Sequence, residues 1–323
     1  MTKPKSYGTR SADTVPDARA GNWVDRWAPA PARPYLRLAR FDRPIGAWLL
    51  LFPAWWSQVL AELALGRPCP NLWYMALFLV GAFVMRGAGC TYNDIVDRDY
   101  DKRVARTAAR PIPSAQVSVG AAFAFLMGLC ITGLLVLLQF NWFTVGLGAS
   151  SLLLIAAYPF AKRFTFWPQA VLGLTFKWGA LVGWAAVTGA LALPALVLYA
   201  GAVLWTIGYD TIYAHQDKED DALVGVKSTA LKFGDATPRW LAAFYAGAVV
   251  LWGAAGLLAG AHAMFLLAIV AAAVQFAWQV WTLDIDDPGS CLARFKSNQV
   301  VGWLLLAGIA GDMALAAVLP VRP

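Results

Sequence analysis

Long apolar segments constrain the fold of this chain more than any other feature. A helix needs about 20 mostly apolar residues to cross a bilayer, and nine segments of roughly this length occur in the 323-residue sequence. They span residues 45–65, 72–89, 117–140, 142–160, 168–188, 191–208, 240–258, 261–283 and 300–319. Since backbone groups in lipid must find their hydrogen-bond partners within the protein, the sequence predicts an all-α, polytopic membrane bundle of about nine transmembrane helices.

The charge distribution gives this bundle an orientation. Charged residues make up only 14% of the chain, whereas soluble proteins contain about 25%. Of the 26 lysines and arginines, 22 lie before residue 45 or in the loops that follow every second apolar segment. The positive-inside rule therefore predicts a cytoplasmic N-terminus. The same asymmetry explains the net charge of +7 without a nucleic-acid partner.

The N-terminal residues differ in composition from the rest. Residues 1–34 are polar and are expected to form a flexible cytoplasmic tail, and residues 35–323 a single intramembrane domain. The tail has no apolar run typical of a signal peptide, and it contains Asp13, Asp17 and Asp25, unlike an acid-poor transit peptide. We therefore expect a bacterial inner membrane location.

The first of two acidic clusters extends the second apolar segment. Asn93, Asp97 and Asp101 are spaced by four residues and share one helical face, with Asp94 beside them. Carboxylates at this spacing repel one another, and the negative end of a helix dipole disfavours anions. A solvated helix end often carries one such Asp, but a cluster requires a compensating cation.

The second acidic cluster follows the sixth apolar segment. It contains Asp210, Tyr213, Asp217 and Asp221, again three or four residues apart. Four apolar segments separate the two clusters, so both are expected on the cytoplasmic face. Asp220 lies beside Asp221, which leaves open which of the two carboxylates binds a ligand.

The side chains of both clusters suit a hard divalent cation. Carboxylate and amide oxygens are preferred ligands of Mg²⁺, which is commonly shared with substrate phosphates. Basic residues lie just beyond both clusters, at Lys102, Arg103, Arg106, Arg110 and Lys227. Because metal ions together with Arg and Lys hold diphosphates, the expected ligand is a diphosphate whose apolar tail lies between the helices.

Several stretches resemble the UbiA superfamily of intramembrane prenyltransferases. The first signature is carried by Asn93-Asp94-x-x-Asp97-x-x-x-Asp101, followed by Arg106-Thr107-x-x-Arg110-Pro111-x-Pro113-Ser114. The second is carried by Asp210-x-x-Tyr213-Ala214-x-x-Asp217-x-x-x-Asp221. Residues 40–46, 158–163 and 225–229 are similar to the members that act on 4-hydroxybenzoate. The likeness extends over nearly the whole chain from residue 35 onward.

The resemblance implies a reaction. A polyprenyl group would pass from polyprenyl diphosphate to the ring carbon ortho to the hydroxyl of 4-hydroxybenzoate, in ubiquinone biosynthesis, with Mg²⁺ as cofactor. Asp97 and Asp217 would be the central catalytic residues. The metal ligands would be Asn93, Asp94, Asp97, Asp101, Asp210, Asp217 and Asp221. The diphosphate ligands would be Lys102, Arg106, Arg110, Lys162, Arg163 and Lys227.

Two basic residues lie within apolar segments. Arg86 precedes Asn93 by seven residues, so it points the same way about 10 Å deeper in the membrane. Burying an Arg there costs roughly 2.5–3.5 kcal/mol, which favours a partner such as the carboxylate of the aromatic acceptor. We therefore predict that Arg86 and Tyr213 bind the acceptor. Lys177 departs from the expected pattern, because a neutral residue is expected at its position.

Two alternatives are also compatible with these sequence features. Other members of the superfamily prenylate heme, naphthoate or homogentisate, and they share the fold. A cation-coupled transporter would also be a polytopic protein with intramembrane carboxylates, but it would place them near the bilayer midplane on broken helices. Here the carboxylates lie at one face, which favours the enzyme.

Overall fold

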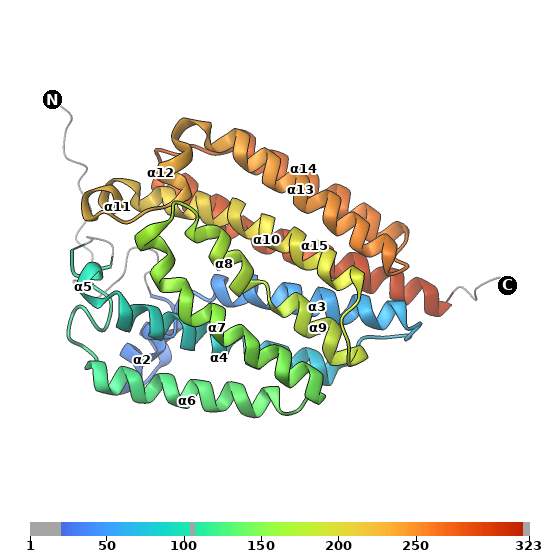
Figure 1. Ribbon diagram of the computed structural model, residues 1–323, viewed down its shortest axis with the longest axis horizontal. Coiled ribbons are helices and arrows are strands. Elements are labelled where there is room, and N and C mark those ends of the chain that lie inside the picture. Colours follow the sequence, from blue (N-terminus) through green and yellow to red (C-terminus); the bar gives the residue numbers. More distant parts are fainter. Residues whose placement is uncertain (1–20, 104–106, 319–323) are drawn as a thin grey trace.

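Most of the chain that the structure describes is helical. The computed structural model describes residues 21–103 and 107–318, except for the side chains at 220, 221 and 224. No strand occurs among these residues, which confirms the all-α prediction. In Figure 1 the long helices run side by side. The short helices α5 (Arg98–Asp101) and α11 (Lys218–Val224) lie at one end of the bundle and the C-terminal end of α15 at the other.

Eight stretches in the described residues are long and apolar enough to cross a membrane, and each corresponds to one predicted segment. They comprise α4 (Leu72–Val96), α6 (Val119–Leu137), α7 (Trp142–Phe164), α8 (Pro168–Phe176) with α9 (Gly179–Thr188), α10 (Leu193–Ala214), α13 (Thr237–Leu258), α14 (Ala263–Thr282) and α15 (Pro288–Val318). The ninth predicted segment forms α3 (Ile45–Ala64), which falls outside this set because its tryptophans, Gln58 and Glu62 lower its hydropathy.

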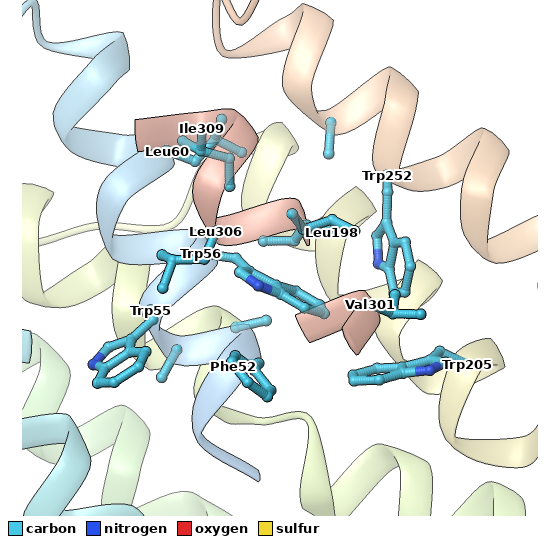
Figure 2. Packing of buried hydrophobic residues seen from close by; sticks show 14 of the residues in the cluster. Phe52, Trp55, Trp56, Leu60, Leu198, Trp205, Trp252, Val301, Leu306 and Ile309 are labelled. Carbon is cyan, nitrogen blue, oxygen red and sulfur yellow. The ribbon is translucent and has the colours of Figure 1, made fainter. Parts of the chain in front are cut away.

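Helix α3 lies at the centre of the bundle. Phe52 and Trp56 are fully buried, and the Trp56 ring packs against Trp205 of α10 and Trp252 of α13, at centroid distances of 5.3 and 5.2 Å (Figure 2). Small residues let neighbouring helices approach α3 closely. On α9, a Cβ at Gly183 would lie 2.3 Å from a backbone oxygen of α3.

The predicted helix over residues 168–188 is interrupted at Lys177 and Trp178. The interruption leaves the Leu174 carbonyl without the usual N–H donor four residues later, and the Tyr199 hydroxyl of α10 donates to it instead at 2.8 Å. Helix α9 then ends at Gly189, whose φ of +73° is the left-handed conformation that glycine adopts without strain.

Two carboxylates that lie far from the acidic clusters stabilise helix ends. Asp312 of α15 accepts hydrogen bonds from the first backbone N–H groups of α14, including Met264 at 2.9 Å. Glu62 of α3 accepts from the backbone N–H of Asn71, and Asn71 in turn caps the start of α4. Because helix N-termini leave donors unpaired, these contacts account for both acidic residues.

Short helices surround the end of the bundle that carries the acidic clusters. Those at the N-terminal side are α1 (Trp23–Trp27), η1 (Ala30–Ala32) and α2 (Arg33–Leu38), and those after α10 are η2 (His215–Asp217), α12 (Thr229–Phe233) and η3 (Gly234–Ala236). Of the predicted tail, residues 1–20 lie outside the described residues. From residue 21 onward it contains α1, where Val24 is fully buried and the Trp23 indole donates to the Phe41 carbonyl at 2.8 Å.

Candidate active site

A cavity of about 320 Å³ lies between six helices at the end that carries the acidic clusters. Its polar wall includes Asn93 and Asp94 of α4 and Asp210 and Tyr213 of α10. The two acidic clusters therefore share one end of the bundle, as predicted. Much of the remaining wall is apolar and comes from Ile45, Leu50, Met85, Ile155, Leu172 and Phe176. The cavity thus combines the surfaces that an amphiphilic substrate requires.

A smaller hollow of about 100 Å³ shares part of this wall. Asn93, Tyr158 and Asp210 line both spaces, while Lys162 and Lys227 line only the smaller one. The segment 225–229 is held against α7 and α8 by backbone contacts. The Lys227 N–H donates to the Lys162 carbonyl at 3.0 Å, and the Thr229 N–H donates to the Gln169 side chain at 3.1 Å.

Asp94 is held by two arginines. Nη2 of Arg40 donates to both of its carboxylate oxygens, at 2.8 and 2.7 Å, and Nη1 of Arg110 donates at 3.1 Å. Arg40 adopts a left-handed conformation with φ of +62°, which is strained for a residue with a side chain. Arg40 was not among the predicted site residues. The only signal for it was its place in the stretch 40–46.

Arg110 bridges the two ends of the first signature. Its Nη1 also lies 2.8 Å from an oxygen of Asp101. Burial raises the pKa of Asp101 above its ordinary value, because desolvation disfavours the carboxylate, and the positive charge of Arg110 opposes the shift. Arg110 was predicted to bind diphosphate. Here it lines the main cavity while it pairs with both carboxylates.

Asp97 is fully buried beside two further basic residues. The Lys162 ammonium lies 2.5 Å from Oδ2 of Asp97, and the Arg163 guanidinium lies 3.7 Å from Oδ1. The structure thus brings these two predicted diphosphate ligands to the first signature. Oδ1 of Asp97 is buried and accepts no hydrogen bond from the described residues. This oxygen retains its capacity to bind a ligand.

Of the three other predicted diphosphate ligands, the structure describes Lys227 and Lys102. The Lys227 ammonium donates to the Phe164 carbonyl at 3.3 Å and borders the smaller hollow. Lys102 is exposed and does not line either space. Arg106 lies outside the described residues.

The second cluster is spread along the end of α10 and beyond. Asp210 borders both spaces, and Tyr213 lines the main cavity with its ring 4.6 Å from that of Phe295. Asp217 ends η2 and is half-buried. The side chain of Asp221 lies outside the described residues. In the part of the chain that the structure describes, no three His, Cys, Asp or Glu side chains are grouped as metal ligands.

The donor atoms nevertheless suit Mg²⁺. Asn93 and Asp210 line the same two spaces, and Asp97 adds a buried oxygen that has no hydrogen-bond donor among the described residues. All are oxygen ligands, which Mg²⁺ prefers to nitrogen or sulfur. The residues present therefore fit this cation.

Arg86 lines the main cavity deeper within α4. Its guanidinium lies over the Phe176 ring, with Cζ 5.1 Å from the centroid, and it packs closely on Gly46, where a Cβ would lie 2.6 Å from Nε. Nε is buried without a hydrogen-bond partner, and Arg86 forms no ion pair with any described residue. Asp210 lines the same cavity and interacts with this charge electrostatically, but no ion pair joins them, so the guanidinium remains available to a bound anion.

These features match a known family. The model of the UbiA prenyltransferase family matches residues 50–309. The chain belongs to this family. The resemblance found in the two signatures is thereby confirmed, and the cation-coupled transporter has no support.

Well-covered relatives within the family share a name. The protein called 4-hydroxybenzoate polyprenyltransferase, mitochondrial, of Caenorhabditis elegans is 47% identical over 292 residues, which cover 90% of this chain and 82% of the relative. Its namesake in Homo sapiens is 48% identical over 287 residues, covering 87% and 76%. Both names specify mitochondria, so they do not support the expected bacterial inner membrane.

Solved structures of the family share the fold. The apo structure of a UbiA homolog from Aeropyrum pernix K1 has a TM-score of 0.67 at 27% identity, and the match covers 82% of this chain and 98% of that one. A UbiA homolog from Archaeoglobus fulgidus, bound to GPP and Mg²⁺, has a TM-score of 0.64 at 18% identity, covering 87% and 99%. The polytopic bundle is thus the fold of the family.

Proposed function

We propose that this protein transfers a polyprenyl group from polyprenyl diphosphate to the ring carbon ortho to the hydroxyl of 4-hydroxybenzoate, a step of ubiquinone biosynthesis. One observation carries the proposal. A single cavity joins residues of the two acidic signatures, an apolar wall and Arg86, which forms no ion pair with a described residue. The names of the relatives at 46–50% identity support the same acceptor.

Mg²⁺ is the proposed cofactor, in line with the Mg²⁺ named in the Archaeoglobus fulgidus structure. The oxygens of Asn93, Asp97 and Asp101 would hold one ion, and those of Asp217 and Asp221, supported by Asp210, another. When bound, Mg²⁺ offsets the negative charge that the diphosphate gains as it leaves. Asp94 is occupied by Arg40 and Arg110, and we assign it to positioning the end of α4.

Basic residues complete the diphosphate site. Lys162 and Arg163 lie beside Asp97, and Arg110 borders the main cavity. Their N–H groups would bind the diphosphate oxygens and stabilise the leaving group. We also assign Lys227, Lys102 and Arg106 to this end of the substrate.

The apolar walls and the acceptor end of the cavity would guide the transfer of the prenyl group. As the allylic C–O bond breaks, its electron pair leaves with the diphosphate, and the apolar walls keep water from the carbocation. Arg86 would hold the carboxylate of 4-hydroxybenzoate with Tyr213 beside the ring, so that the ortho carbon attacks the cation. That carbon then loses its proton, and the ring regains aromaticity.

The protein acts within a membrane that its helices cross several times. We propose that the active site faces the cytoplasm, because 22 of the 26 lysines and arginines lie on that side in the predicted topology.

Acceptor specificity tests the proposal directly. Membranes that contain the protein are incubated with Mg²⁺, one polyprenyl diphosphate, and radiolabelled 4-hydroxybenzoate, a dihydroxynaphthoate, homogentisate or heme. We expect a labelled lipid-soluble product from 4-hydroxybenzoate alone. Membranes with the Asp97→Asn variant serve as the control. A product from another acceptor, with none from 4-hydroxybenzoate, contradicts the proposal.

A further inference from the structure

Lys177 is a fully buried lysine at the interruption between α8 and α9. Its ammonium donates to the Leu49 carbonyl of α3 at 2.6 Å. Aromatic rings cover the rest of the charge, with the centroids of Trp205, Tyr209 and Phe176 at 4.3, 5.1 and 5.2 Å from Nζ. Lys177 forms no ion pair with any described residue. Asp210 acts on it electrostatically, but its hydrogen-bond partner is the Leu49 carbonyl.

Pro53 explains why the Leu49 carbonyl needs a donor from another helix. In α3 this carbonyl would normally accept from the N–H group four residues later, and proline has none. Within a bilayer an unpaired carbonyl finds no water. Lys177 therefore supplies the hydrogen bond that Pro53 removes, and it ties the first half of α3 to the interruption after α8.

The same lysine contacts one of the surfaces on which Arg86 rests. The Phe176 ring lies within cation–π distance of both Lys177 Nζ and Arg86 Cζ, at 5.2 and 5.1 Å. The other surface is the start of α3, where Arg86 packs on Gly46 and where Leu50 lines the cavity. Lys177 thus fixes both walls that surround Arg86, although it is not among the residues that line the cavity.

We infer that Lys177 is a positioning residue for acceptor binding. It holds Phe176 and the segment of α3 before Pro53 in the arrangement that directs Arg86 into the cavity. The inference rests on the proposed function, in which Arg86 binds the acceptor carboxylate. It predicts that loss of the Lys177 donor weakens acceptor binding while the diphosphate end of the site, formed around Asp97, is left intact.

The Lys177→Met variant tests this by a comparison of two Michaelis constants. Methionine keeps the length of the chain but has no N–H group, so the Leu49 carbonyl loses its donor. Because the buried Leu49 carbonyl would then be unpaired, we expect KM for 4-hydroxybenzoate to rise about tenfold, which corresponds to about 1.4 kcal/mol. KM for the polyprenyl diphosphate should stay near that of the wild type.

A second change restores the donor from within α3. In Pro53→Ala/Lys177→Met the alanine N–H again pairs with the Leu49 carbonyl, so the acceptor KM should return most of the way to the value of Pro53→Ala alone. This pair keeps the test valid if Lys177→Met does not fold. Lys232→Met is the matched control, because it removes an exposed lysine that lies 4.9 Å from the Trp167 ring.

The outcomes separate the inference from the proposed function. An Arg86→Ala variant is measured in the same assay. The positioning role is wrong, and the proposed function stands, if Arg86→Ala raises the acceptor KM but Lys177→Met does not. The same conclusion follows if Lys177→Met raises the KM values of both substrates equally and the double variant does not recover. If Arg86→Ala leaves the acceptor KM unchanged, the acceptor site itself is misassigned.

Discussion

Nη2 of Arg40 donates to both carboxylate oxygens of Asp94, and both side chains are almost completely buried. Nη1 of Arg40 also donates to the Arg37 carbonyl at 3.0 Å, near the end of α2. One guanidinium therefore joins the segment before α3 to the first signature on α4. The ion pair contributes to the site by fixing the position of the helix that carries Asn93 and Asp97.

Loss of Arg40 should destabilise the protein strongly. Removing one member of a buried ion pair costs about 3–5 kcal/mol, and because Asp94 keeps Arg110 as a partner the loss should lie at the lower end of this range. We expect the thermal midpoint of Arg40→Ala in detergent to fall by several degrees. Arg37→Ala is the control, since its pair with Asp25 is more exposed than the Arg40–Asp94 pair and should therefore contribute less. Similar midpoints for the two variants would contradict the role of Arg40.

Turnover should depend on Mg²⁺ and on one carboxylate from each signature. We expect EDTA to abolish activity and added Mg²⁺ to restore it. Asp97→Asn and Asp217→Asn should each lower kcat by roughly 10³-fold, because each weakens the stabilisation of the leaving diphosphate. Asp99→Asn removes a carboxylate that is 69% exposed and should retain wild-type turnover. Unchanged rates in the first two variants would show that neither carboxylate takes part in catalysis.

The contact between Lys218 and Asp286 predicts a pH-dependent contribution to stability. A hydrogen bond and the positive charge of Lys218 lower the pKa of Asp286 below its usual value. A lowered carboxyl pKa stabilises the fold above the unfolded-state value of about 3.9, and this contribution disappears as the pH falls through the lowered value.

The Asp286→Asn variant measures this contribution. Since the pair is exposed, its thermal midpoint should be about 1 °C below that of the wild type at pH 7. The difference should shrink as the pH falls below about 3.9 and disappear once the pH is below the lowered pKa of Asp286. A difference that persists in acid would show that the ion pair is not its cause.

The sequence predicted the helices well because their apolar segments are long. Two helices are longer than the apolar segments that predicted them, because polar residues at the ends of a helix do not break it. The segments 72–89 and 300–319 lie within Leu72–Val96 and Pro288–Val318, apart from residue 319. The interruption at Lys177 was not predicted. It depends on contacts with Leu49 and Tyr199 that are distant in the sequence.

The sequence predicted which residues lie at the candidate site better than it predicted which of them form ion pairs. Spacing placed Asn93 and Asp210 at one membrane face, and both line one cavity. Spacing gave no indication that Arg40 pairs with Asp94, because 54 residues separate them and the left-handed conformation of Arg40 has no sequence signature. The roles of the metal ligands remain predictions.

Topology should follow the distribution of basic residues. Reporter fusions at Asp97, Lys162, Asp217 and Lys296 should respond as cytoplasmic, and those at Arg67 and the C-terminus as external. The reason is that 22 of the 26 lysines and arginines lie on the predicted cytoplasmic side. An external signal at Asp97 and Asp217 would reverse the orientation, and opposite signals from the two would contradict the fold.

The central proposal is that one cavity binds both substrates, with Arg86 at the acceptor end. Steady-state kinetics of Arg86→Ala test it most directly. The variant loses a paired contact with the acceptor carboxylate, and because such a contact contributes about 1.5–3 kcal/mol, KM for 4-hydroxybenzoate should rise about 10- to 100-fold. KM for the polyprenyl diphosphate should change little, and Arg86→Lys should recover only part of the loss, because an ammonium cannot form the paired contact. An unchanged acceptor KM, or a defect chiefly in diphosphate binding, would contradict the account.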